Sequence, residues 1–116
     1  MLIDFHYHYA DTKGALEELL RNMDASGVEK TLLMGGPAGA WWEYKQCGFA
    51  PNAAVLEAVK GHPDRLIGNA YCDPREPNAL AELKRFLDAG FRAVKLFPPA
   101  GFFPDDERAM PLYEEI

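Results

Sequence analysis

The chain has 116 residues, of which 48% are hydrophobic and 26% are charged. This is the composition of an ordinary globular protein, and the length leaves room for one domain only. The formal net charge is −6 and neither half of the chain has an excess of Lys and Arg, which argues against a partner such as nucleic acid or an anionic membrane.

Apolar periodicity predicts strands and helices in alternation. Strands are expected at residues 2–8, 28–34, 66–72 and 91–97, and helices at 15–26, 52–60 and 77–89. A further helical start is expected near residues 105–107, and a last helix at 110–116. Each of the first three helices is followed by a glycine that can adopt the left-handed conformation of a helix stop, namely Gly27, Gly61 and Gly90. This order predicts an α/β fold of parallel (β/α) repeats, with right-handed crossovers and a sheet covered by helices.

The first predicted strand ends in Ile3-Asp4-Phe5-His6-Tyr7-His8. Side chains alternate across a strand, so Asp4, His6 and His8 are expected on one face. Parallel strands are usually buried on both faces, where ionisable groups are costly unless something pairs with them. Two neutral imidazoles two residues apart can converge on a metal ion beyond the carboxyl end of the strand, where parallel α/β folds keep their active sites. The alternative is that both histidines are ordinary polar residues, in the core or on an edge strand facing water.

Several stretches resemble one family. Ile-Asp-x-His-x-His at the end of the first strand resembles the amidohydrolase superfamily, in particular its amidohydrolase-related (amidohydrolase 2) branch. Residues 61–68, Asp73-Pro74 and residues 89–96 resemble the same branch. Its members are metal-dependent (β/α)8 TIM barrels that mostly hydrolyse C–N or ester bonds, and some relatives are nonoxidative decarboxylases. The resemblance implies that residues 1–116 are the N-terminal half of such a domain, its first four βα units.

The resemblance also implies a metal site. His6 and His8 would bind a divalent metal ion, most often Zn²⁺, with Mn²⁺ or another ion as the alternative. The family's further ligands, histidines after strands 5 and 6 and an aspartate after strand 8, would lie outside this chain. Lys95, on the fourth predicted strand, stands where some binuclear members carry a carboxylated lysine that bridges two metals. The alternative for Lys95 is a buried lysine that pairs with a carboxylate or extends its ammonium group to the strand end.

Three other reactive side chains are expected to be structural. His62 lies between Gly61 and Pro63 at the amino end of the third strand, where a turn or helix-capping role is expected. Asp73 begins an Asp-Pro turn, and Cys72 before it is a small core residue.

The longest connection, from Gly35 to Ala50, is a candidate functional loop. The segments after the strands hold seven of the fourteen aromatic residues, which must be buried under a lid or around a ligand. Trp41, Trp42 and Phe102 are candidates for a pocket that takes an aromatic or otherwise apolar substrate. Packing within the loops or a subunit contact would explain them equally well.

These features predict an enzyme, a metal-dependent hydrolase in which a metal-activated water attacks a C–N or ester bond of a small-molecule substrate. A nonoxidative decarboxylase of the same fold is the alternative within the family. A non-catalytic α/β fragment or binding module is the alternative from another class. A nucleotide-binding doubly wound sheet is disfavoured by the loop after the first strand, residues 9–14, and Gly35-Gly36-Pro37 lacks the glycine pattern of a phosphate cradle.

Location and partners follow from the remaining features. Cys47 and Cys72 are too few for a disulfide framework and no signal peptide is recognisable, so a cytoplasmic protein with free thiols is expected. A half-barrel leaves two strand edges unpaired. We therefore expect a fragment that pairs with a missing C-terminal half, or forms a homo-oligomer, before it can catalyse a reaction.

Overall fold

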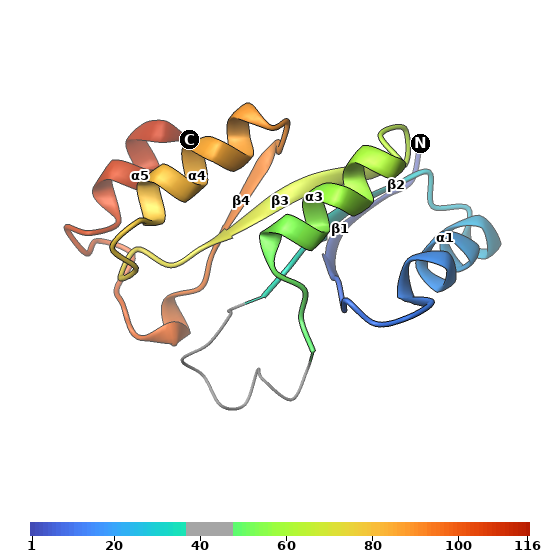
Figure 1. The fold of residues 1–116 in the computed structure, drawn as a ribbon, viewed down its shortest axis with the longest axis horizontal. Helices are drawn as coiled ribbons and strands as arrows, with labels where there is room; N and C mark the ends of the chain where they lie inside the picture. Colours follow the sequence, from blue (N-terminus) through green and yellow to red (C-terminus); the bar gives the residue numbers. More distant parts are fainter. Residues whose placement is uncertain (37–47) are drawn as a thin grey trace.

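A computed structural model of the protein describes residues 1–36 and 48–116. Strands and helices alternate along the chain, as the sequence predicts, and Figure 1 shows the α-helices following one another along the sheet from right to left. The elements in chain order are β1 (Ile3–His8), α1 (Ala15–Ser26), β2 (Lys30–Met34), α3 (Asn52–Gly61), β3 (Leu66–Cys72), α4 (Ala79–Asp88), β4 (Ala93–Leu96), the 3-10 helix η1 (Pro98–Ala100) and α5 (Met110–Glu115).

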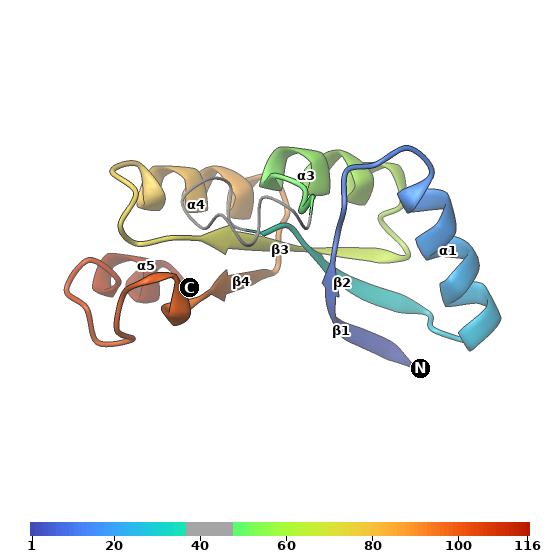
Figure 2. The same cartoon turned by 90° about the horizontal axis from the view of Figure 1, so that it is seen from below.

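The four strands form one parallel sheet in the order β1-β2-β3-β4, so strands that follow one another in the sequence are neighbours in the sheet. Figure 2 shows α3 and α4 on the same side of β3, as right-handed crossovers require. The result is a half-barrel of four βα units, which is the fold class expected from the sequence.

The main hydrophobic core lies between the sheet and the helices. Alternate positions of β2 and β3, such as Leu33, Leu66 and Ala70, are at most 2% exposed there. Gly68 belongs to the same row, and a Cβ at this position would overlap the ring of Phe91. The helices contribute Leu19 and Met23 of α1, Val55 and Ala58 of α3, and Leu83 and Phe86 of α4.

Two of the three predicted glycine stops are confirmed. Gly27 has a φ of 68° and Gly90 a φ of 108°, a region that residues with a Cβ rarely adopt. The prediction for Gly61 is wrong, because it is the last residue of α3 and His62 caps the helix instead, donating its backbone N–H to a carbonyl of the last turn. The carbonyl of His62 accepts two backbone N–H groups at the start of β3, so the structural role expected for His62 is confirmed.

The predicted helical start near residues 105–107 is wrong. Residues 107–109 form a turn, and α5 begins only at Met110. The carboxylate of Asp106 accepts the backbone N–H of Arg108 at 2.9 Å, a local hydrogen bond that favours a turn over a helix.

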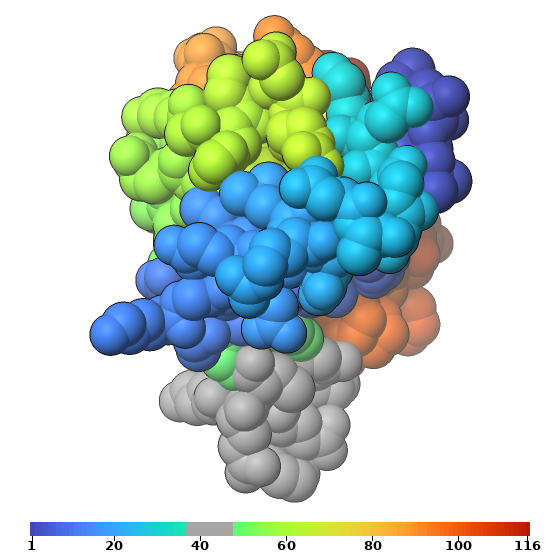
Figure 3. Space-filling model, turned by 90° about the vertical axis from the view of Figure 1, so that its right-hand side faces the viewer, coloured from blue at the N-terminus to red at the C-terminus, as the bar shows by residue number. Residues whose placement is uncertain are grey.

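At the amino ends of the strands, Arg65 joins the connection between α1 and β2 to the start of β3. Its guanidinium donates to the Asp24 carboxylate at 2.7 Å and to the backbone carbonyls of Glu29 and Val28 at 3.0 and 3.3 Å. A groove of about 420 Å³ lies here, and Figure 3 shows α1 (light blue) beside the yellow-green segment that leads to β3. This is the end of a parallel barrel opposite the usual site of chemistry. No helix among the described residues is long and apolar enough to cross a membrane.

Candidate metal centre

A register shift in β1 decides how its two histidines are presented. The three-residue step from Asp4 to Tyr7 spans only two residues of β2. The alternation expected from the sequence is therefore wrong across this stretch, because the register places Asp4 on the side of Tyr7, which packs toward the helices, and not with His8. The Asp4 carboxylate instead accepts the backbone N–H of His6 at 2.9 Å and stabilises the irregular segment.

The rings of His6, within this irregular stretch, and His8, just after it, meet edge to face. Their Nε2 atoms are 3.2 Å apart, and the ring planes form an angle of 65°. Nδ1 of His8 lies 3.0 Å from the backbone carbonyl oxygen of Gly35. Because a carbonyl can only accept, Nδ1 carries the proton, and Nε2 of neutral His8 is an acceptor at hydrogen-bond distance from Nε2 of His6.

The surroundings of His8 favour its neutral form. Burial lowers the pKa of His8 from its ordinary value of 6.5. The hydrogen bond with Gly35 raises the pKa by less, and electrostatic interactions with His6 and Lys95 lower it further. A neutral imidazole is the form that binds metal ions.

The geometry of the two histidines fits a metal ion. Two nitrogens bound tetrahedrally to one zinc ion at about 2.0–2.1 Å lie roughly 3.3 Å apart, and the Nε2 atoms of His6 and His8 are 3.2 Å apart. A ligating histidine usually donates its other ring N–H to a carbonyl or carboxylate, as His8 does to Gly35. In residues 1–36 and 48–116, however, no group of three or more His, Cys, Asp and Glu side chains could hold a metal ion. The two histidines are thus part of a ligand set at most.

Lys95 lies on the same face of the sheet as His8. The register places one row of residues on this face, namely His8, Met34, Asn69 and Ala93. Lys95 follows Ala93 by two residues on β4, and its ammonium nitrogen is 5.9 Å from the ring centroid of Phe97. Its charge acts on the pKa of His8, as stated above, but a role of Lys95 as a ligand stays a prediction.

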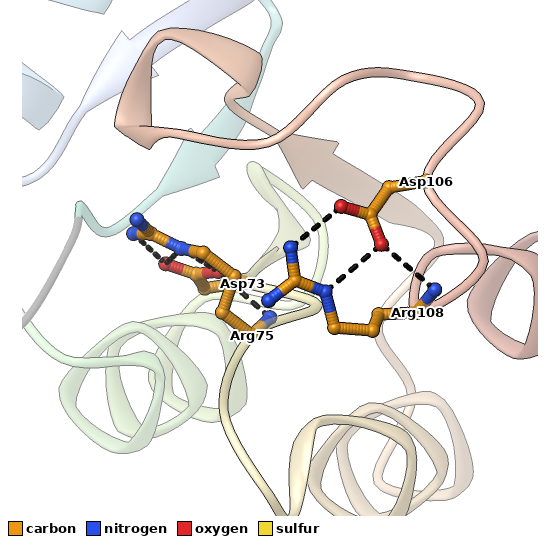
Figure 4. A network of polar contacts seen from close by, with 4 residues as sticks. All are labelled: Asp73, Arg75, Asp106 and Arg108. Atoms are coloured by element: carbon orange, nitrogen blue, oxygen red, sulfur yellow. Dashed lines mark hydrogen bonds and ion pairs between the residues drawn. The ribbon is translucent and has the colours of Figure 1, made fainter.

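Two Asp–Arg pairs lie beyond the carboxyl ends of β3 and β4 (Figure 4). Arg75 donates to Asp73 from Nε at 2.9 Å and from Nη2 at 2.6 Å, and Arg108 donates to Asp106 at the same two distances. Burial acts to raise the pKa of Asp73, but the hydrogen bonds and charge of Arg75 outweigh it, and the pKa is lowered. The carboxylate also accepts the backbone N–H of Arg75 at 3.0 Å, which confirms the predicted turn.

The predicted pocket residues are not brought together by the described part of the chain. Trp41 and Trp42 lie outside the described residues. Phe102 follows η1 and is 5% exposed, and it does not line the groove near Arg65. Its role in substrate binding stays a prediction. Cys72 is 5% exposed and burial raises its pKa to about 11, so its expected place in the core is confirmed.

Two residues support this end of the sheet in ways that sequence reasoning did not predict: Phe49 was one of the seven aromatic residues noted after the strands, and Asn52 was noted only as the start of a helix. Phe49 stacks on His8 with ring centroids 4.6 Å apart. Asn52, the first residue of α3, accepts the backbone N–H of Tyr71 at 2.9 Å and donates to its carbonyl at 2.8 Å. These contacts join positions far apart in the chain, for which periodicity gives no signal. The available indications were the length of the connection between β2 and α3 and the aromatic residues in it.

The order of the parallel strands and the histidine pair at the end of β1 together point to part of a TIM barrel rather than to a doubly wound sheet. The chain belongs to the amidohydrolase family, whose model matches residues 3–116. The resemblance seen in the sequence is thereby confirmed, and this family is generally metal-dependent. A comparison with curated proteins finds no match.

Solved structures with the same fold include three of particular similarity. An uncharacterised TIM-barrel protein from Bordetella bronchiseptica has a TM-score of 0.74 at 22% identity, covering 98% of this chain and 50% of that one. 4-Oxalomesaconate hydratase from Rhodopseudomonas palustris has a TM-score of 0.70 at 21% identity, covering 99% of this chain and 49% of that one. 2,6-Dihydroxybenzoate decarboxylase, solved with 2,6-dihydroxybenzoate, has a TM-score of 0.68 at 21% identity, covering 99% of this chain and 47% of that one. At these identities the likeness establishes the fold, the first four units of a TIM barrel, and the chain spans about half the length of these structures.

Proposed function

We propose that this chain forms the N-terminal half of the catalytic domain of a metal-dependent hydrolase that acts on a C–N or ester bond of a small molecule. One observation carries the proposal: the Nε2 atoms of His6 and His8 are 3.2 Å apart, while Nδ1 of His8 donates to the Gly35 carbonyl. Membership of the amidohydrolase family supports it. Zn²⁺ is the proposed ion, with Mn²⁺ as the alternative.

The residues of this chain have distinct roles in the proposal. His6 and His8 hold the ion, and burial keeps His8 in the neutral form that can bind it. The ion supplies a water of lowered pKa and a Lewis acid that polarises a carbonyl group. Lys95 is a candidate further ligand on the same face of the sheet. The other ligands and the general base would come from residues outside this chain, and Trp41, Trp42 and Phe102 would line the substrate pocket.

A nonoxidative decarboxylase is the second candidate, favoured by the fold likeness to 2,6-dihydroxybenzoate decarboxylase. The same histidines would then hold the ion that orients the substrate. In either case we propose a cytoplasmic protein whose barrel is completed by a C-terminal half or by a second copy. Two assays separate the reactions. Cleavage of an ester or amide would indicate the hydrolase, and release of CO₂ would indicate the decarboxylase.

Metal content tests the proposal, with His62 as a matched control. In the complete barrel, this chain together with its C-terminal half, His6→Ala and His8→Ala should each abolish the stoichiometric binding of zinc or manganese, measured by elemental analysis of the purified protein. His62→Ala should keep the metal, because His62 caps α3 at the opposite end of the sheet. A well-folded complete barrel of wild-type sequence that takes up no divalent metal overturns the proposal.

A further inference from the structure

The ring of His8 is constrained on more than one side. The hydrogen bond from Nδ1 to Gly35 fixes one atom of the ring but leaves the ring free to tilt about that contact. Rotation about the bond to an aromatic or imidazole ring has a broad energy profile, so a second contact is needed to set the plane. The ring of Phe49 provides it, lying 4.6 Å from the His8 ring between centroids at an interplanar angle of 25°.

Phe49 is itself held by backbone interactions. An antiparallel bridge pairs it with Ala10, just after β1. The N–H of Ala50 donates to the carbonyl of Tyr9 at 2.8 Å, and the N–H of Tyr9 donates to the carbonyl of Met34 at 2.7 Å. The segment that carries Phe49 is therefore bonded to the chain that follows the histidines, and that chain is bonded to the end of β2.

The two glycines after β2 leave room for this arrangement. A Cβ on Gly36 would overlap the ring of Phe49, and a Cβ on Gly35 would overlap the carbonyl oxygen of Ala50. The N–H of Gly36 also donates to that carbonyl at 3.3 Å. Gly35-Gly36, which offers no phosphate cradle, thus serves the close packing of Phe49 beside His8.

We propose that Phe49 is a positioning residue of the metal centre, which by stacking on His8 holds its Nε2 in line with that of His6. The inference rests on the metal site proposed above. Hydrogen-bonding partners that orient a ligating histidine typically contribute 10–100-fold to metal affinity, and we expect a stacked ring that fixes the same imidazole to act on a similar scale. Phe49 fixes the plane of the His8 ring, whereas the Gly35 carbonyl fixes which nitrogen of that ring carries the proton.

Metal affinity measured by competition with a chelator tests this role. Phe49→Leu should weaken zinc binding by about 10-fold or more, because the flat partner of the imidazole is lost. Phe49→Tyr should restore affinity close to wild type, because the ring remains. Phe86→Leu is the matched control: it removes a ring that stacks on Phe91 at 5.2 Å and 26° within the core, and should lower the melting temperature without changing zinc affinity.

A second readout needs no metal. In the metal-free protein the ring current of Phe49 should displace the proton NMR signals of the His8 ring, and Phe49→Leu should remove that displacement. A Phe49→Leu variant that binds zinc as tightly as the wild type overturns the inference about Phe49. The proposed metal site is unaffected by that result. A complete barrel of wild-type sequence that binds neither zinc nor manganese overturns the proposed function itself.

Discussion

Asp73 and His8 are both ionisable residues at the carboxyl ends of strands, yet their surroundings suit them to different tasks. Asp73 accepts three side-chain hydrogen-bond contacts from Arg75, which engage its charge and lower its pKa. His8 has a pKa lowered by burial, and its Nε2 is an acceptor at hydrogen-bond distance from Nε2 of His6. The Nε2 atom of His8 can therefore bind a metal ion, whereas the carboxylate of Asp73 is bonded to Arg75 and stabilises a turn.

The Asp73–Arg75 pair predicts a pH-dependent stability. The pKa of Asp73 is below its ordinary value of 3.8, so its contribution is fully present above pH 3.8 and is lost as the pH falls through the lower, folded-state pKa. At pH 7, Asp73→Asn should cost about 1–3 kcal/mol of unfolding free energy. Thermal unfolding of both proteins between pH 7 and pH 3 should show the difference shrinking at the acidic end. Asp88→Asn, at the exposed end of α4, is the control, and a constant difference across this range would contradict the account.

At the scale of elements, the carboxyl end of β3 extends past its neighbour β2. The last register pair of these strands is Met34 with Asn69, so Tyr71 lies beyond the paired stretch of β2 and β3. The carboxamide of Asn52 takes the place of a strand, accepting from the Tyr71 N–H and donating to its carbonyl. One side chain thereby joins the start of α3 to the end of β3, close to the residues that carry the proposed chemistry.

Removing this side chain should loosen the end of β3. Asn52→Ala leaves a backbone donor and acceptor of Tyr71 without these partners, at an expected cost of about 1–3 kcal/mol in unfolding free energy. Asn78→Ala provides the comparison, since Asn78 is also an asparagine at the start of a helix, the N-cap of α4, but makes no side-chain cap hydrogen bond. Urea titration of both variants measures the costs, and equal costs would count against the role of Asn52.

At the scale of the whole molecule, the half-barrel has features that suit a larger structure. β1 is an edge strand of the described sheet, and Phe5 on it is 69% exposed. On the face shared with His8, the carboxamide oxygen of Asn69 is buried without a hydrogen-bond partner among the described residues. An exposed apolar edge and a buried acceptor both favour contact with further protein.

This open edge predicts self-association of residues 1–116 produced alone. Sedimentation velocity at rising concentration should show growing assemblies, because an unprotected edge strand pairs readily with other chains. Phe5→Lys should shift the distribution toward monomer by placing a charge on the edge. Phe103→Lys, at a side chain 77% exposed but away from the strands, should have no such effect. A monodisperse wild-type monomer at all concentrations would refute this prediction.

Much of the fold could be predicted because its signals are local. The apolar spacing of α1 and the run of β3 gave their observed bounds, and Gly27 and Gly90 marked the helix stops. Predictions failed where a competing local hydrogen bond decided the conformation. His62 capped α3 in place of Gly61, and Asp106 formed a turn in place of a helix start.

The sequence by itself determined the βα order and the placement of His6 and His8 at the carboxyl end of the first strand, because both depend on periodicity within a few residues. Only the tertiary structure decided how those histidines are used. The register shift that turns Asp4 away, the carbonyl of Gly35 on His8 and the ring of Phe49 depend on contacts with β2 and with the segment after it. Such contacts arise when distant segments pack together, and a linear pattern does not encode which of them will meet.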